Sequence, residues 1–259
     1  MVDIKGSIRV MSALIELEVR RVMHDRTELY FRAVQPLLWL LVFGQVMAKT
    51  RAISTGSLGY EDFLAPGILA QSALFSAIFF GIAVIWERDL GVLHKYLVSP
   101  AARSSLVTGK ALAGGLRALV QGTMVYAIAL VIGVHLRLDP LSIVGAALVV
   151  VIGSAAFATF SLVIACLVRT RERFMGIGQV LTMPLFFASS AIYPISIMPD
   201  WLKVIAQVNP LTYQVDALRG LMIQGATESF PLWLDFAVLI GSTIVLIVIA
   251  ARLYPRLAQ

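Results

Sequence analysis

Long stretches without a charged side chain constrain this chain most. Residues 63–86, 118–134 and 141–168 contain no Asp, Glu, Lys or Arg. A helix needs about 20 predominantly apolar residues to cross a bilayer. With 59% hydrophobic residues, 14% charged residues and a mean hydropathy of +0.88, the chain has too little polar material to cover a soluble surface. The sequence therefore predicts an all-α integral membrane protein.

The apolar runs predict six transmembrane helices in a single transmembrane domain, residues 1–259. The expected spans are residues 33–48, 63–86, 111–134, 141–168, 174–191 and 236–251. We expect a cytoplasmic helix at 1–32, the six-span domain at 33–251 and a cytoplasmic tail at 252–259. The first span is short for a bilayer and is expected to borrow flanking residues.

The N-terminal segment predicts an amphipathic helix rather than a signal peptide. Its apolar side chains recur every three or four residues, at Ile8, Met11, Ile15, Val19 and Val22. Arg9, Glu16 and Arg20 project from another face. This pattern is typical of a helix that lies along a membrane interface, here on the cytoplasmic side. A soluble surface helix that precedes the first span is the alternative.

A charged segment, residues 87–110, lies between the second and third expected spans. It carries four basic residues, Arg88, Lys95, Arg103 and Lys110, against two acidic ones, Glu87 and Asp89. Short loops rich in Lys and Arg stay in the cytoplasm, so this loop is expected to face inward. If both chain ends are also inside, most of the 21 Lys and Arg residues lie on the cytoplasmic side.

Within this segment we expect a short helix along the membrane surface. Leu90, Leu93, Tyr96 and Leu97 recur at helical spacing, with polar residues placed among them. Pro100 ends the helix, because a proline disfavours helical backbone in the residue before it.

Residues 193–235 have intermediate polarity and precede the last expected span. Pro194, Pro199 and Pro210 divide them into pieces too short to cross a bilayer. Residues 201–208 and 211–222 are each expected to form a short helix. We expect a re-entrant or surface-lying extracellular hairpin, because broken backbone at membrane depth is tolerated only against protein or water.

The spans lack the groups that coupled carriers and enzymes commonly use. No ionisable side chain is expected in the middle of a span, whereas ion-coupled transport usually needs one. The three histidines, His24, His94 and His135, fall in separate surface regions, and no paired carboxylates or Ser/His/Asp set is visible. No GxxxxGK[ST] motif occurs either. If the protein moves cargo uphill, another chain must bind the nucleotide.

Two stretches together carry a specific resemblance. WERDLGVLHKYLVSPAARSSLVTGKALAGGLRALVQG, residues 86–122, resembles the Glu-x-x-x-Gly loop and following helix of the type-2 ABC exporter permeases. SSAIYPISIMPDWLKVIAQVNPLTYQVDALRGLMIQG, residues 189–225, is similar to that family's signature before the last span. The similarity is greatest to the daunorubicin-resistance and nodulation-factor exporter branch.

The resemblance implies a set of partners and two sets of site residues. Two ATP-binding subunits, carrying ATP and Mg, would drive two paired permease chains, identical or related, in the cytoplasmic membrane. This chain would hold no cofactor and bind no nucleic acid, and it would contact membrane lipid. The residues implied for coupling to the ATPase are Glu87, Arg88, Asp89, Gly91, Leu93, Leu97 and Pro100. Those implied for an outer gate are Tyr193, Pro194, Asn209, Pro210, Tyr213, Asp216 and Arg219.

The resemblance also bears on the cargo. Export of a drug, a lipid or a glycolipid is the expectation, because apolar walls suit a hydrophobic or amphipathic molecule, although such walls equally suit lipid contact. A polysaccharide or oligosaccharide exporter is the alternative within the family. A membrane enzyme and a secondary carrier are the alternatives outside it.

Overall fold

The computed structural model describes residues 4–24, 34–51, 53–56, 58–91, 103–168, 170–226 and 228–254. In the first half the helices are α1 (Ile4–His24), the π-helix η1 (Trp39–Gly44), α3 (Gln45–Thr50), α4 (Tyr60–Asp89) and α6 (Arg103–Ile132). In the second half they are α7 (Pro140–Leu167), α8 (Arg171–Phe187), the 3-10 helix η2 (Ile195–Ile197), α9 (Asp200–Val208), α10 (Pro210–Met222) and α11 (Leu232–Leu253). Within the described residues the β-structure is one isolated bridge, between Leu136 and Ile223. The expected all-α fold is confirmed for this part of the chain.

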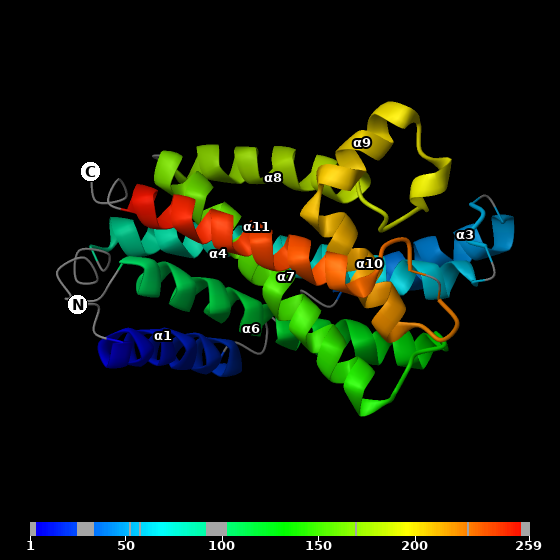
Figure 1. Ribbon diagram of the computed structural model, residues 1–259, viewed down its shortest axis with the longest axis horizontal. Helices are drawn as coiled ribbons and strands as arrows, with labels where there is room; N and C mark the ends of the chain where they lie inside the picture. The colour runs from blue at the N-terminus through cyan, green and yellow to red at the C-terminus, as the bar shows by residue number, and fades with distance from the viewer. Residues whose placement is uncertain are drawn as a thin grey trace.

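Helix α7 lies at the centre of the bundle, where it packs against α4, α6, α10 and α11 (Figure 1). Small residues let the helices approach closely: a Cβ at Gly153 in α7 would overlap the Gln214 side chain of α10. In the most apolar stretch of each helix, 78% of residues are buried in α4 and 67% in α7, but only 17% in α11. Helices α4 and α7 are therefore interior, and α11 presents most of its apolar surface outward, as a lipid-facing helix does.

Four helices are long and apolar enough to cross a membrane: α4, α6, α7 and α11. They match four of the six expected spans. The other two expected spans are also helical: residues 34–50 contain η1 and α3, and α8 covers 17 residues. At 1.5 Å per residue α8 is about 26 Å long, slightly less than the hydrocarbon core of a bilayer. The count of six spans stays a prediction.

The polar ends of the helices separate into two groups (Figure 1). One end of the bundle holds the C-terminal end of α4, the N-terminal ends of α6 and α8, and the C-terminal end of α11. The other end holds α3, the connection between α6 and α7, and the short helices α9 and α10. We call these the inner and outer ends, after the side of the membrane that the loop charges predict.

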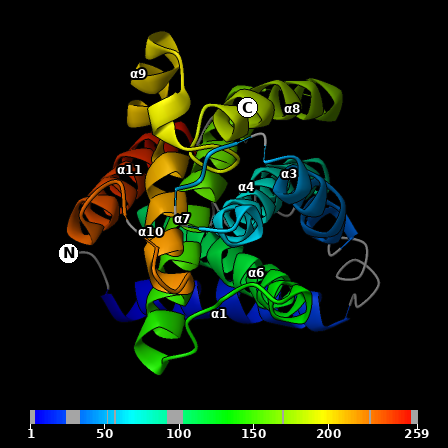
Figure 2. The ribbon, with the colours of Figure 1, turned by 90° about the vertical axis from the view of Figure 1, so that its right-hand side faces the viewer.

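Helix α1 crosses the inner part of the bundle beneath α6 (Figure 2). Met11, Leu14 and Ile15 are half-buried, whereas Arg9, Glu16 and Arg20 are exposed, so the expected amphipathic pattern is present in the described side chains. The sequence did not indicate that Glu18 lies on the buried face, 2.7 Å from Arg117 of α6. This ion pair, 6% and 11% exposed, fixes α1 to α6.

Candidate functional site

The charged inner segment is shorter than the sequence suggested. Glu87, Arg88 and Asp89 continue α4 to its end, and residues 103–110 already belong to α6. Only residues 90–102 therefore lie between the two helices. Charges at the end of a transmembrane helix resemble those of a loop, which explains the misplaced boundary. Leu93, Leu97 and Pro100, together with the short helix expected around them, lie outside the described residues.

An ion pair between Glu87 and Lys110 joins the two helices on either side of this segment. Glu87 lies in the last turn of α4 and Lys110 in the second turn of α6. The side chains are 16% and 4% exposed, so the pair is largely withdrawn from water. Removing one partner of a buried pair leaves an uncompensated charge. The pair therefore holds the two ends of the segment at a fixed separation.

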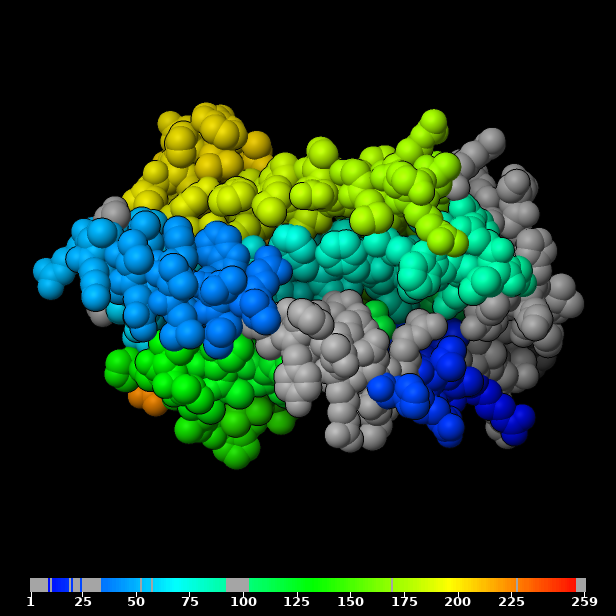
Figure 3. Space-filling view, turned by 180° about the vertical axis from the view of Figure 1, so that it is seen from behind, coloured from blue at the N-terminus to red at the C-terminus, as the bar shows by residue number. Residues whose placement is uncertain are grey.

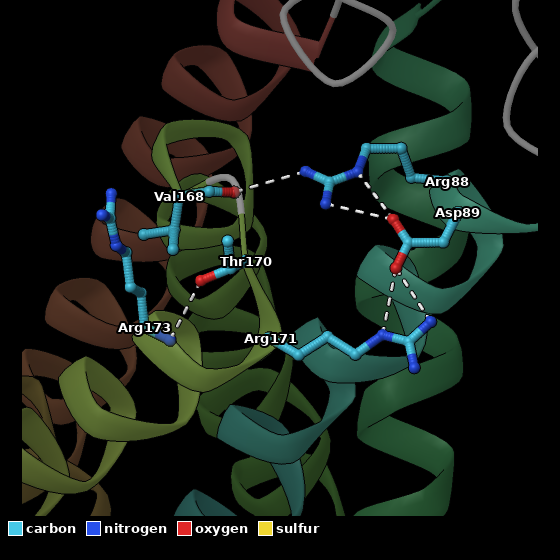
Figure 4. Close-up of polar contacts among 6 residues, drawn as sticks. All are labelled: Arg88, Asp89, Val168, Thr170, Arg171 and Arg173. Atoms are coloured by element: carbon cyan, nitrogen blue, oxygen red, sulfur yellow. Dashed lines mark hydrogen bonds and ion pairs between the residues drawn. The ribbon is translucent and has the colours of Figure 1, made fainter.

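Asp89 lies between two arginines from different parts of the chain (Figure 4). Its Oδ1 accepts hydrogen bonds of 3.2 Å from Nε and Nη2 of Arg88. Its Oδ2 accepts from Arg171, the first residue of α8, with 3.0 Å from Nε and 2.8 Å from Nη2. Arg88 Nη1 also donates to the carbonyl oxygen of Val168, at 3.3 Å. Asp89 thus connects the end of α4 to the connection between α7 and α8.

Two further features of the inner end suit contact with a partner. Gly91 has φ +70°, a left-handed conformation that favours glycine. No atom of the described residues lies within 4 Å of a Cβ placed there. Leu90 is 76% exposed beside the charges. The inner end therefore combines an exposed apolar side chain with a rigid charged base.

At the outer end, Asp216 of α10 fixes the segment that leads into α11. Its carboxylate accepts hydrogen bonds from the backbone N–H groups of Ser229, at 3.1 and 2.9 Å, and Phe230, at 2.9 Å. Asp216 is fully buried. Buried hydrogen bonds are costly to leave unmade, so this contact holds the segment before α11 against α10.

Arg219 makes the second buried contact of α10. Its Nη2 donates to the carbonyl oxygen of Ser190 at 2.7 Å, and its guanidinium lies 3.9 Å from the centre of the Phe63 ring. The distance from Arg219 Nη1 to Asp216 Oδ1 is 3.9 Å. Both residues are buried, and Arg219 joins α10 to α4 and to the turn after α8.

Asn209 joins α10 to the end of α8. Its Oδ1 accepts from the N–H of Leu211 and caps α10, whose first residue is Pro210. Its Nδ2 donates to the carbonyl oxygens of Leu185, at 2.7 Å, and Ala188, at 2.9 Å. These carbonyls belong to the last turn of α8, which has no intrahelical donors of its own. Asn209 therefore completes the ends of two helices at once.

The remaining residues expected at the outer gate make contacts near their own positions in the chain. The Tyr213 hydroxyl donates to the carbonyl oxygen of Gln207 at 2.6 Å, and its ring lies 5.0 Å from that of Phe230. Burial raises the pKa of the Tyr193 hydroxyl, which stays protonated and donates to the carbonyl oxygen of Phe187. Pro194 precedes η2. The structure thus places Tyr193, Asn209, Pro210 and Tyr213 around the junction of α8, α9 and α10, and Asp216 and Arg219 further along α10.

An apolar groove of about 750 Å³ lies beside this junction, between the outer half of α8 and α9. Pro184, Phe187, Trp201, Val204 and Ile205 are among its lining residues. Two of its polar residues, Tyr193 and Asn209, donate hydrogen bonds to the backbone of the α8 end, and Trp201 adds an indole N–H. The groove therefore offers a hydrocarbon surface and few free hydrogen-bonding groups.

Several polar features of the structure were not predicted from the sequence. Asp235 was placed before the last span, but α11 begins at Leu232; Asp235 is fully buried and neither of its carboxylate oxygens has a hydrogen-bond partner in the described part of the chain. Lys110 was assigned only to the charged segment at residues 87–110. Opposite charges at both ends of a connection were the available signal for the Glu87–Lys110 pair. Nothing local indicated Arg171 as the partner of Asp89, 82 residues away.

Metal-site geometry is absent from the described residues, where no three His, Cys, Asp or Glu side chains gather closely enough to hold an ion. The arrangement suits the transmission of movement between helices. Ion pairs fix the helix ends at the inner side, and buried polar contacts join helices at the outer side.

Comparison with known proteins places this arrangement in a family. The ABC-2 type transporter family matches residues 9–223. The transport permease ycf38 of Cyanophora paradoxa is 29% identical over 223 residues, covering 83% of this chain and 76% of the relative. The daunorubicin resistance ABC transporter permease protein DrrB1 of Streptomyces coeruleorubidus is 25% identical over 231 residues, or 89% and 81%. Nodulation protein J of Rhizobium leguminosarum bv. trifolii is 25% identical over 191 residues, or 73% and 71%.

These relatives include both groups of the branch that the sequence resembles, and the family match covers both motifs almost completely. Together with the apolar helices, they show that the chain is a multi-pass membrane protein and belongs to the ABC-2 type transporter family, as a transmembrane permease subunit that works with separate ATP-binding subunits.

Proposed function

We propose that this permease exports a hydrophobic or amphipathic molecule, such as a drug, a lipid or a glycolipid, across the cytoplasmic membrane. Two ATP-binding subunits, with their ATP and Mg²⁺, drive it, and a second permease chain, identical or related, completes the path. Six helices span the membrane, and both chain ends are cytoplasmic. The name of the daunorubicin resistance relative supports a drug-like cargo.

This proposal rests mainly on the ion pairs that fix both ends of the inner segment, residues 90–102. Glu87–Lys110 fixes the segment at both sides, and Asp89 fixes it to the start of α8. A segment that receives a push from another subunit must pass it to the helices rather than absorb it by bending. Buried and networked ion pairs supply that stiffness better than an exposed single pair does.

The apolar groove between α8 and α9 supports hydrophobic cargo over a polysaccharide. A sugar chain carries many hydroxyl groups, and burying them without hydrogen-bond partners is costly. Apart from the indole N–H of Trp201, the polar side chains that line the groove are those of Tyr193 and Asn209, and both already bond to the α8 end. A hydrocarbon or aromatic part of a cargo leaves no hydrogen-bonding group unpaired when it is buried there.

Reconstitution with the ATP-binding subunit in proteoliposomes tests the proposal. Glu87→Ala and Gly91→Trp are expected to abolish ATP-driven transport while membrane insertion, followed by fractionation, stays normal. Arg20→Ala, which removes the exposed Glu16–Arg20 pair, is the matched control and should transport normally. Unchanged export by both inner variants would count against ATPase coupling at this segment.

Two further outcomes separate the alternatives. A secondary carrier would continue to transport without ATP and stop when an ionophore collapses the ion gradient. A membrane enzyme would convert its substrate without any ATP-binding subunit. Comparing a hydrophobic cation, a glycolipid and an oligosaccharide as stimulators of ATP hydrolysis identifies the cargo class; stimulation by the oligosaccharide alone would overturn the hydrophobic assignment.

A further inference from the structure

Helix α8 is held firmly at its inner end. Arg171 bonds to Asp89, and its guanidinium lies 5.4 Å from the centre of the Trp86 ring. Phe174 is 1% exposed and packs beside Gly81 of α4, where a Cβ would overlap both the Phe174 ring and Ser161 Oγ. Ser161 Oγ in turn donates to the carbonyl oxygen of Ile78 at 2.5 Å. The first turn of α8 is thus fixed to α4 and α7.

The outer end of α8 is held as firmly. Asn209 donates to the Leu185 and Ala188 carbonyls, as described above. Phe186 is fully buried, and its ring lies 5.9 Å from that of Trp39. Any axial displacement of α8 must therefore move Asn209, and with it the N-terminus of α10, or break these bonds.

Between its ends α8 is packed loosely. A cavity of about 180 Å³ lies between its middle and α4, lined by Ile78, Phe79, Gly178, Gln179 and Thr182 among others. Beside it, Gly178 approaches Ile78 closely. The opposite side of the helix is exposed: Val180 is 69% and Ile177 41% exposed. Figure 3 shows α8 lying open along its length on the back face, between α9 and the end of α4. Close packing resists sliding, so a helix with little of it can shift with small loss of contact.

We infer that α8 is the rod that transmits displacement of the inner segment to the outer residues, with Asp89 and Arg171 as positioning residues at its inner end and Asn209 at its outer end. This rests on the proposed function, since the push comes from the ATP-binding subunits. Because Asp89 shares its carboxylate between Arg88 and Arg171, the end of α4 and the start of α8 move together. The rigid outer contacts then carry the movement to α10.

A double-mutant cycle in the reconstituted complex tests the inner joint. The variants are Arg171→Gln, Asp89→Asn and the double variant, and the measured quantity is cargo moved per ATP hydrolysed. Arg171→Gln should keep the basal rate of ATP hydrolysis but lower cargo per ATP about fivefold or more, the usual scale of coupling between sites. The double variant should be no worse than either single one, because all three lose the same bond. Arg171→Lys, which keeps a cation, should restore part of the ratio.

A reporter on α9 tests the outer joint. Cys166 is the only cysteine, so Cys166→Ser with Val208→Cys, a position 77% exposed, allows one spin label. ATP should change the label's spectrum in the parent and not in Arg171→Gln or Asn209→Ser; Ser at 209 still caps α10 but cannot reach the α8 carbonyls. Arg20→Gln, at an exposed pair, is the control and should respond as the parent does.

The outcomes distinguish a failure of the proposed role of α8 from a failure of the proposed export function. If the parent complex hydrolyses ATP and transports cargo, yet the joint variants keep cargo per ATP and the ATP-dependent spectrum, the rod is wrong and the exporter assignment stands. Losses that add in the double variant also overturn it, because the two residues then act separately. If the parent itself neither binds an ATP-binding subunit nor transports, the proposed function fails first.

Discussion

The inner and outer ends of this permease are built from different kinds of polar contact. At the inner end, charged side chains pair with each other: the Glu87–Lys110 pair is largely buried, whereas Asp89 is 35% exposed and Arg171 43%. At the outer end, Asp216, Arg219 and Asn209 are buried and bond mainly to backbone groups. Exposed pairs contribute little to the free energy of unfolding, whereas buried bonds are costly to leave unmade. The inner end suits repeated contact with a partner. The outer end suits a structure that opens only when a force is transmitted to it.

Removal of Arg219 should have the largest effect on stability. Arg219→Leu takes away the donor to Ser190 and leaves the buried Asp216 without its nearest cation, at a cost of about 3–5 kcal/mol in the free energy of unfolding. Thermal unfolding in detergent measures it, with the surface variant Lys203→Gln as the control. A loss as small as that of the control would show that the outer contacts are not stabilising.

At the inner end, the largest loss is expected from Glu87. Glu87→Ala leaves Lys110 buried, which should cost about 3 kcal/mol. The double variant Glu87→Leu with Lys110→Met removes both charges and should unfold at nearly the temperature of the parent, because apolar replacement of a buried pair is often neutral. A double variant less stable than Glu87→Ala would contradict this account of the pair.

The Asp216 hydrogen bonds should rank next. Asp216→Asn weakens two backbone contacts from charge-assisted to neutral, with an expected loss of about 1.5–3 kcal/mol. Hydrogen exchange should speed up at the amides of Ser229 and Phe230 and stay unchanged at Leu211, whose donor bonds to Asn209. Uniform exchange across all three amides would indicate global rather than local loosening.

The smallest stability effect should come from the exposed Arg171. Arg171→Gln is expected to cost about 0–1 kcal/mol, and the difference from the parent should shrink as salt is raised to 1 M, since salt screens exposed charges. Unfolding in low and high salt measures it. A large effect that salt does not change would place the inner network with the buried outer contacts and remove the contrast between the ends.

The helices whose starts are marked by Pro or Asn were predicted best from the sequence. The short helices expected at 201–208 and 211–222 are present as Asp200–Val208 and Pro210–Met222, because Pro199, Asn209 and Pro210 mark their starts. The inner boundary was wrong because Glu87–Asp89 are polar yet helical. The family resemblance named Arg219 for the outer gate but did not indicate its burial, which depends on Ser190 and Phe63 from distant segments. Contacts of long sequence separation, such as Asp89–Arg171, leave no local pattern to detect.

The claim that an ATP-binding subunit pushes on the inner end is tested most directly by site-specific cross-linking. A photoreactive residue replaces Leu90, 76% exposed at the inner end, or Leu141, 82% exposed at the outer end, in the assembled complex. The account predicts a cross-link to the ATP-binding subunit from position 90 and none from position 141. A cross-link from position 141, with none from position 90, would contradict it.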